Sequence, residues 1–348
     1  MVSREPVAFE IPARLARWEP SDAPVVSCYV DWSVSGRGLH EQPTVVRHAL
    51  REALGQLEPR STAYTSLEAD VERIETFLAK EADPAARALA IFACSAAGLW
   101  EVHSLGVPLA TRVQVGERPL LLPLVEATQD AARTLVAVVD TNSARLISLA
   151  PSGASEVAGP SRETATVKHS TEGGWGSLGY QRHVDTEIER FAADIASVIE
   201  DVMKRQDLHH LVLAGGEAIV PPIAQALTEA TRSRLDAREH IDIREGRDSI
   251  AERVWPEVAS MVHARRLAEV GVIVGRVEAG RDAVGTSIPV LEAVRAGRVD
   301  TLALDADRVE EAAAELLLHE ALAHRSRVLV VRGESALTTL DGLAATLR

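Results

Sequence analysis

The hydrophobic pattern in the first third of the chain switches between strand and helix periods. Short continuous apolar runs predict buried strands, and apolar positions three or four residues apart predict amphipathic helices. The predicted strands are VVSCYVDW (25–32), ALAIFAC (88–94) and GLWEVHSL (98–105), and the predicted helices are 44–57 and 66–80. This order of elements predicts one α/β domain over residues 1–128.

The middle of the chain begins with a strand, a tight turn and a returning strand over residues 133–151. A polar stretch and a glycine-rich segment separate this hairpin from further periodic elements. The predicted elements are helix 184–203, strand 208–216, a helix opened by Pro221 and helix 248–269 with Asp248 as its N-cap. Together these elements predict a second domain over residues 129–268.

The remaining residues, 269–348, show the same alternation and predict a third domain. Its predicted elements are helix 288–297, strand 299–305, helix 308–324 and strand 326–333. The fold class predicted from the pattern is therefore α/β (mixed α+β) with three consecutive domains. The length of 348 residues agrees, because it exceeds what one ordinary core covers.

Charge and cysteine content narrow the possible functions. The net charge of −14, from 37 basic and 51 acidic side chains, argues against nonspecific binding to free DNA or RNA but leaves room for a few local contacts with a ribonucleoprotein. Cys28 and Cys94 belong to no CxxC pair and are expected to be buried free thiols in a reducing cytosol. No signal segment precedes the pattern, and no apolar run approaches the roughly 18 residues of a membrane span. The sequence therefore predicts a cytoplasmic protein with no membrane partner.

Three motifs suggest chemistry that their details do not support. LVLAGGEA (211–218) ends a strand in glycines but lacks GxGxxG and GK[ST], so it favours a turn where glycines let a helix approach the sheet. His319 and His324 are five residues apart, which turns them roughly 140° from each other on a helix and rules out one shared zinc. Asp140 and Asp305 end strands, where turn or cap roles are more common than catalysis. We predict no metal and no cofactor.

The segment TEGGWGSLGYQRH (171–183) is different from these motifs. It places four glycines, a Trp and a Tyr ahead of a strong amphipathic helix, and glycine makes such a backbone permissive. One interpretation is a surface loop whose aromatic packs back on the body. The other is a mobile loop whose tip enters another molecule's cavity, with Trp175 at the tip. The glycines concerned are Gly173, Gly174, Gly176 and Gly179.

The order of hairpin, GG loop, aromatic, Arg, long helix and strand ending in GG resembles the middle domain of the archaeal and eukaryotic class-1 release factors and of Pelota. Their loop reads Gly-Gly-Gln, then Ser, a small residue, any residue, Arg, Phe, any residue, Arg. Gly173, Gly174, Tyr180 and Arg182 match the glycines, the aromatic and the final Arg. The first and last domains resemble the bacterial branch of the family, which includes the Balon-type ribosome hibernation factors. This resemblance implies a projecting glycine-rich loop and a C-terminal α/β/α sandwich.

The sequence departs from the release factors at the residue that carries catalysis. Trp175 stands where the glutamine positions water against the peptidyl ester, and an indole offers one N–H donor and no acceptor. Losing such a group costs ~10²-fold or more in rate. An indole can instead stack on bases, worth about 1–3 kcal/mol per base. The first domain also lacks the Asn-Ile-Lys-Ser stop-codon motif.

Three functions stay open at this point. The first is a non-catalytic factor that fills the ribosomal A site in hibernation, stress or rescue, and the resemblance implies a translational GTPase as a partner. The second is a peptidyl-tRNA hydrolase that uses Gln181 as a weak catalytic candidate. The third is a binding module that has left the ribosome. For the first, the candidate contacts with rRNA or tRNA lie in the loop over 168–183. They are Lys168, His169, Gly173, Gly174, Trp175, Gly176, Ser177, Tyr180, Arg182 and His183.

Overall fold

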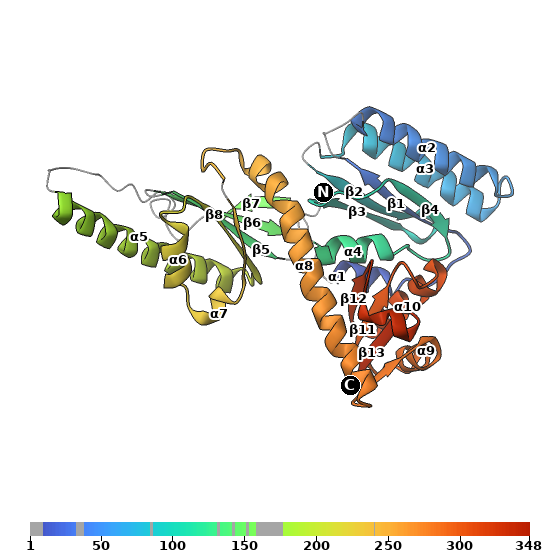
Figure 1. Ribbon diagram of the computed structural model, residues 1–348. Coiled ribbons are helices and arrows are strands. Elements are labelled where there is room, and N and C mark those ends of the chain that lie inside the picture. Colours follow the sequence, from blue (N-terminus) through green and yellow to red (C-terminus); the bar gives the residue numbers. More distant parts are fainter. Residues whose placement is uncertain are drawn as a thin grey trace. The chain divides into compact units, whose positions relative to one another are not determined.

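The computed structural model describes residues 10–32, 38–83, 86–130, 133–140, 143–150, 153–157, 177–239 and 241–348. They form three sheets with helices, which confirms the predicted α/β class (Figure 1). The chain divides into two compact units, one of Met1–Asp130, Pro151–Gly153 and Val262–Arg348, the other of Ala131–Ala150 and Ala154–Met261. The three predicted domain boundaries stay a prediction.

The first sheet belongs to the first unit and is wholly antiparallel, in the order β3-β2-β1-β4. Its strands are β1 (Val25–Asp31), β2 (Ala88–Cys94), β3 (Leu99–Leu105) and β4 (Arg112–Gly116). Helices α2 (Gly38–Gly55) and α3 (Thr62–Lys80) cover one face, where alternate residues such as Cys28 and Ile91 join their apolar stripes. Ser61 caps α3 by accepting a hydrogen bond from the Tyr64 N–H. Two short helices complete this part, α1 (Glu10–Leu15) and α4 (Leu122–Asp130).

The second unit is built on a mixed sheet in the order β7-β6-β5-β8-β9. Its strands are β5 (Thr134–Val139), β6 (Ala144–Ala150), β7 (Gly153–Glu156), β8 (His210–Gly215) and β9 (Leu235–Glu239). The predicted hairpin pairs β5 with β6, whereas β5, β8 and β9 run parallel. The helices are α5 (Ser177–Arg205), α6 (Val220–Ala226) and α7 (Glu229–Arg232), and α6 carries proline in its first turn as predicted.

The third sheet, again in the first unit, has the order β10-β13-β11-β12, with β11 and β12 parallel. Its strands are β10 (Ala283–Gly285), β11 (Val299–Asp305), β12 (Arg327–Val331) and β13 (Leu343–Leu347). The later part of α8 (Arg247–Glu278) packs on one face through Val270, Ile273 and Val274. Helices α9 (Ser287–Arg295) and α10 (Glu311–Ala323) lie on the other side. The predicted α/β/α sandwich is confirmed.

Several helix predictions were wrong in their limits, among them α2, which begins at Gly38 instead of 44. Helix α5 begins at Ser177 instead of 184, because the apolar stripe marks only the part that packs on the sheet. Helix α8 continues to Glu278 instead of ending at 269, because Val270, Ile273 and Val274 pack in the core of the third sheet and offset the cost of Gly271 inside a helix. Asp248 lies inside the first turn of α8 and pairs with Arg247, so it favours the helix dipole without being the N-cap.

Candidate functional site

The tip of the predicted glycine loop lies outside the described residues. This applies to Lys168, His169, Gly173, Gly174, Trp175 and Gly176. The remaining candidates, Ser177, Tyr180, Gln181, Arg182 and His183, belong to the first turns of helix α5. Their backbone is therefore helical, and the predicted loop is shorter at its C-terminal end than 168–183.

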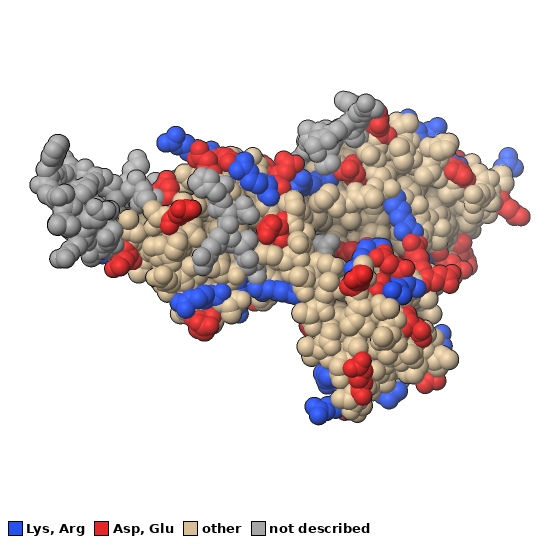
Figure 2. All heavy atoms as spheres, viewed as in Figure 1, with Lys and Arg blue, Asp and Glu red and all other residues tan. Residues whose placement is uncertain are grey.

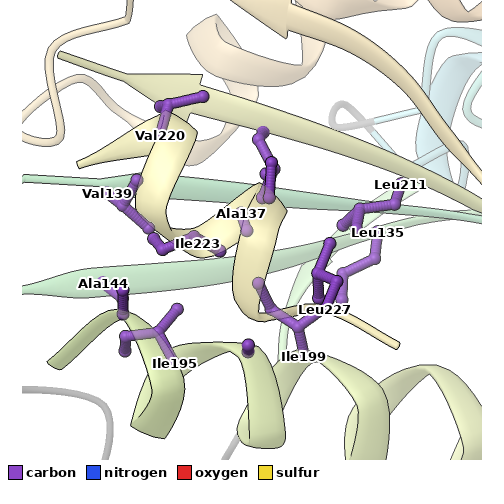
Figure 3. Close-up of a cluster of buried hydrophobic side chains, with 14 of the residues drawn as sticks. Leu135, Ala137, Val139, Ala144, Ile195, Ile199, Leu211, Val220, Ile223 and Leu227 are labelled. Atoms are coloured by element: carbon purple, nitrogen blue, oxygen red, sulfur yellow. The ribbon is translucent and has the colours of Figure 1, made fainter. Parts of the chain in front are cut away.

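Helix α5 fixes the point where the chain leaves this loop. At about 1.5 Å per residue, its 29 residues span about 43 Å. Its described core residues run from Ile188 to Met203 and pack on β5, β8 and α6. Figure 3 shows Ile195 and Ile199 projecting from α5 toward this layer. In Figure 1 the N-terminal end of α5 extends past the sheet, so the helix holds the loop's exit away from the core.

The chain enters the same segment from the edge of the sheet. The Val157 N–H donates to the Leu146 carbonyl at 2.9 Å, so the last described residue before the loop is attached to β6. Arg145 strengthens this edge, because its Nη1 donates to the carbonyls of Ile243 at 2.7 Å and Glu245 at 2.6 Å, and its guanidinium pairs with Glu156. The entry to the loop segment is thus attached to the sheet directly, and its exit is connected to the same sheet through α5.

The glycines after β8 serve a close approach of strands. A Cβ at Gly215 would lie 2.2 Å from the Val139 carbonyl oxygen on β5, whereas one at Gly216 would meet nothing within 4 Å. The prediction that these glycines allow close packing, and do not form a phosphate loop, agrees with this contact. The partner, however, is the neighbouring parallel strand and not the following helix, because Gly215 pairs directly with Val139.

The other rejected motifs have structural roles. Asp140 accepts the Ser143 N–H at 2.6 Å in the hairpin turn, and Asp305 accepts the Asp307 N–H at 3.1 Å and the Ser335 hydroxyl at 2.8 Å. Within the described ranges, no cluster of three potential metal ligands occurs. No described helix has the length and apolarity of a membrane span. Cys28 and Cys94 are buried and free, and burial raises the pKa of the Cys28 thiol to about 12.

A buried polar junction, which the hydrophobic pattern does not predict, joins α10 to the start of α4 within the first unit. The Glu315 carboxylate accepts the N–H groups of Leu121 at 2.8 Å and Leu122 at 2.7 Å. These N–H groups lie at the α4 N-terminus, where a negative charge is favourable. Burial nevertheless raises the pKa of Glu315 to about 7 against the effect of both donors.

The backbone groups of Pro119 and Leu120 are contacted by side chains from α10 and from β1. His319 Nε2 lies 2.8 Å from the Pro119 oxygen and Nδ1 lies 3.3 Å from the Ala16 oxygen. Burial lowers the pKa of His319, so the imidazole is neutral at pH 7 and the shorter contact assigns its proton to Nε2. The Tyr29 hydroxyl donates to the Leu120 carbonyl at 2.6 Å, and the Ser27 hydroxyl accepts the Leu120 N–H at 2.9 Å. Residues 119–122 are thus bound by β1 and α10 together.

Comparison with known proteins identifies the central segment. Residues 119–257 match the family described as "Bacterial archaeo-eukaryotic release factor family 10". This segment is similar to the bacterial members of the archaeo-eukaryotic release factors. The match confirms the resemblance predicted from the strand order and the GG loop, and it contains both ends of that loop. No curated protein matches the chain.

Several solved structures are similar at low identity. The archaeal termination factor aRF1 is 16% identical, with 98% of each chain covered and a TM-score of 0.28. Archaeal Pelota, from a model of ribosome-bound Pelota and ABCE1, is 22% identical over 75% of this chain and 77% of that chain, with a TM-score of 0.46. S. cerevisiae Dom34 is 12% identical over 75% and 78%, with a TM-score of 0.40. Since all three TM-scores are below 0.5, the family match alone identifies the segment.

Proposed function

We propose that this protein is a ribosome-associated translation factor that occupies the A site without codon-specific termination. The observation that carries the proposal is the family match over residues 119–257, because this range contains the whole loop over 168–183. A role in hibernation, stress or rescue fits a factor that fills the site without releasing peptide. A translational GTPase that delivers the protein is part of the same proposal.

The geometry around the loop supports such a role. The core of the second unit grips α5 over residues 188–203, while the helix itself begins at Ser177. A loop at the far end of a firmly packed helix can enter a narrow site without unfolding its own domain. The glycines of the loop lower the steric cost of that approach.

The residue at the tip decides between occupation and hydrolysis. Trp175 replaces the glutamine of the release-factor loop and cannot accept a proton from water. A large planar ring can stack on rRNA or tRNA bases. The proposal therefore assigns Trp175 to binding and assigns no residue to catalysis.

Co-sedimentation with vacant bacterial ribosomes tests the proposal. We expect the wild-type protein to sediment with ribosomes and Trp175→Ala to bind about 5–150-fold more weakly, which corresponds to the loss of one stacked base. Trp175→Phe is the matched control, because it keeps an aromatic face and should retain most of the affinity. No sedimentation of the wild type, alone or with a GTPase, would exclude the ribosomal function.

A peptidyl-tRNA release assay tests the hydrolytic alternative. We expect no release by the wild type above that of ribosomes alone. Release that is lost in Gln181→Ala would instead establish a rescue hydrolase. Trp175→Gln restores the Gly-Gly-Gln triplet and serves as a comparison for what the scaffold permits with that residue.

A further inference from the structure

A hollow of about 780 Å³ in the first unit is lined by four arginines. We call it the arginine hollow; its lining residues are Ala13, Arg14, Arg17, Leu322, Arg325, Ser326 and Arg327. They come from the end of α1, the turn after α10 and the start of β12. None of these seven residues is acidic or aromatic. The hollow is distinct from the glycine loop, which belongs to the other unit.

The backbone around the arginine hollow is fixed. The end of α1 lies against α10, where the Ala16 carbonyl oxygen is 3.3 Å from His319 Nδ1. The Ser326 N–H donates to the Ala321 carbonyl at 2.8 Å, and the Ser326 hydroxyl donates to the Val299 carbonyl at 2.8 Å. The arginines therefore project from a preformed frame.

Two of the arginines are held by carboxylates outside the hollow. Arg14 donates through Nε and Nη2 to Glu101 at 3.1 and 2.7 Å, and Arg327 pairs through two nitrogens with Glu269. Such two-point pairs orient a guanidinium and lower the entropy lost when it binds a further anion.

The other two arginines have no acidic partner within 4 Å among the described residues. Arg17 and Arg325 are exposed and add two uncompensated positive charges to the lining. Arginine is favourable near a helix C-terminus, which can account for arginines that follow α1 and α10 but not for Arg327 at the start of β12. On the face drawn in Figure 2, acidic and basic side chains are interspersed. In a chain with a net charge of −14, a hollow with this lining is locally opposite in sign.

We propose that the arginine hollow binds the phosphate backbone of duplex RNA. The inference rests on the proposed function, because it assigns a second contact with ribosomal RNA to a surface separate from the loop. Guanidinium groups match phosphate oxygens through paired N–H donors. The lining offers no aromatic ring for base stacking, which disfavours unpaired strands and predicts binding that does not depend on base sequence.

The test uses the full chain and a short fluorescein-labelled RNA duplex of mixed sequence. We expect Arg17→Ala/Arg325→Ala to weaken binding by about tenfold or more and to reduce the slope of log K against log salt by about 2, one for each lost phosphate contact. The matched control is Arg281→Ala/Arg295→Ala, which removes two exposed arginines elsewhere in the same unit. Both double variants change the net charge equally.

The possible outcomes separate this inference from the proposed function. Equal losses in both double variants, or no duplex binding by the wild type, would overturn the hollow as an RNA site. Direct binding of inorganic phosphate by the wild type at constant ionic strength, with no affinity for the duplex, would also overturn it in favour of a free-phosphate site. Ribosome co-sedimentation is measured in parallel. If the wild type binds the duplex through the hollow but not ribosomes, the proposed function fails while the RNA site stands.

Discussion

Helices α5 and α10 both pack beside a sheet, but different groups hold them in place. The described core contacts of α5 are apolar, with Phe191, Ile195 and Ile199 among its fully or almost fully buried residues. Helix α10 also has an apolar side, but Glu315 and His319 project from it into the buried junction with residues 119–122. The comparison separates an attachment that depends on volume from one that depends on protonation.

The difference matters for function because α5 leads from the glycine loop, whereas α10 fixes residues 119–122 in the first unit. Apolar packing has no titratable group, so the loop's exit stays anchored over a wide pH range. The junction at residues 119–122 contains the Glu315 carboxyl, whose pKa is about 7. Near neutrality this group changes between its charged and neutral forms, and with it the strength of the hydrogen bonds that it accepts from the N–H groups of Leu121 and Leu122.

The largest effect is expected from Ile199→Ala in α5. Ile199 is fully buried, and removing a large aliphatic side chain from a core costs about 2–5 kcal/mol. Hydrogen exchange measured by mass spectrometry should show faster exchange in β5 and β8. Ser197→Ala, on the exposed side of the same helix, is the control and should change exchange little. Equal exchange in both variants would mean that α5 is not anchored by this core.

The second prediction concerns pH and Glu315. The carboxyl pKa is about 7 in the folded chain and about 4.5 when unfolded, so the folded state holds the proton more tightly between these values. Stability should therefore fall as pH rises from about 4.5 to about 7, by about 3 kcal/mol at most. Urea midpoints followed by tryptophan fluorescence measure this, and Glu315→Gln should flatten the dependence in that window.

Glu101 provides an internal contrast of opposite sign. Burial alone would raise its pKa, but hydrogen bonds from His103 and Arg14 lower it to about 2. Its contribution is present above about pH 4.5 and is lost as pH falls toward 2. Acid sensitivity that survives in Glu315→Gln but disappears in Glu101→Gln would assign the two windows separately. A single window abolished by either variant would contradict the assignment.

The third prediction tests the close strand pairing beneath α5. Gly215→Ala places a Cβ 2.2 Å from the Val139 oxygen, so β5 or β8 must shift, at a cost of about 1–3 kcal/mol or more. Gly216→Ala is the adjacent control, since a Cβ there meets nothing within 4 Å. The urea midpoint should fall only for the first variant. A matching fall for both would contradict the clash with Val139 as the cause, because lost glycine flexibility in the unfolded chain would raise the midpoint instead.

The smallest effect is expected at the rim of the α10 junction. Arg112 and Glu311 form an ion pair, but both side chains are partly exposed, at 39% and 47%. Such pairs contribute about 0–1 kcal/mol and weaken with salt. Glu311→Gln should therefore lower the urea midpoint slightly at low salt and not at high salt. A loss as large as that of Ile199→Ala would show that the rim, and not the buried carboxyl, holds α10.

Long, periodic elements were predictable from the sequence because burial leaves a strong pattern. The predicted run 88–94 is strand β2 with every residue buried, and 299–305 is strand β11. Short elements escaped prediction. Strand β4 is only partly buried along its length, and β10 has only three residues. Strand β13 contains small residues, so none of the three strands shows a clear hydrophobic period.

The candidate site was predictable only in part. The GG loop and the resemblance came from local residues, and the family match supports them. The junction could not be predicted from local residues, because Glu315 is 194 and 193 residues away from the two N–H groups whose hydrogen bonds it accepts. Glu315 and His319 stand four residues apart on one helix, a spacing that signals a shared face. The spacing does not indicate which residues that face contacts.

The same separation sets an order of events during synthesis. Residues 119–122 leave the ribosome about 10–40 s before Glu315, at translation rates of about 5–20 residues per second. The second unit, formed by Ala131–Ala150 and Ala154–Met261, is complete within that interval. Until α10 is made, the Pro119 carbonyl and the N–H groups of Leu121 and Leu122 lack their partners and depend on water or a chaperone. Helix α10, which is synthesised after the second unit, thus completes the hydrogen bonding of residues 119–122, which are synthesised before it.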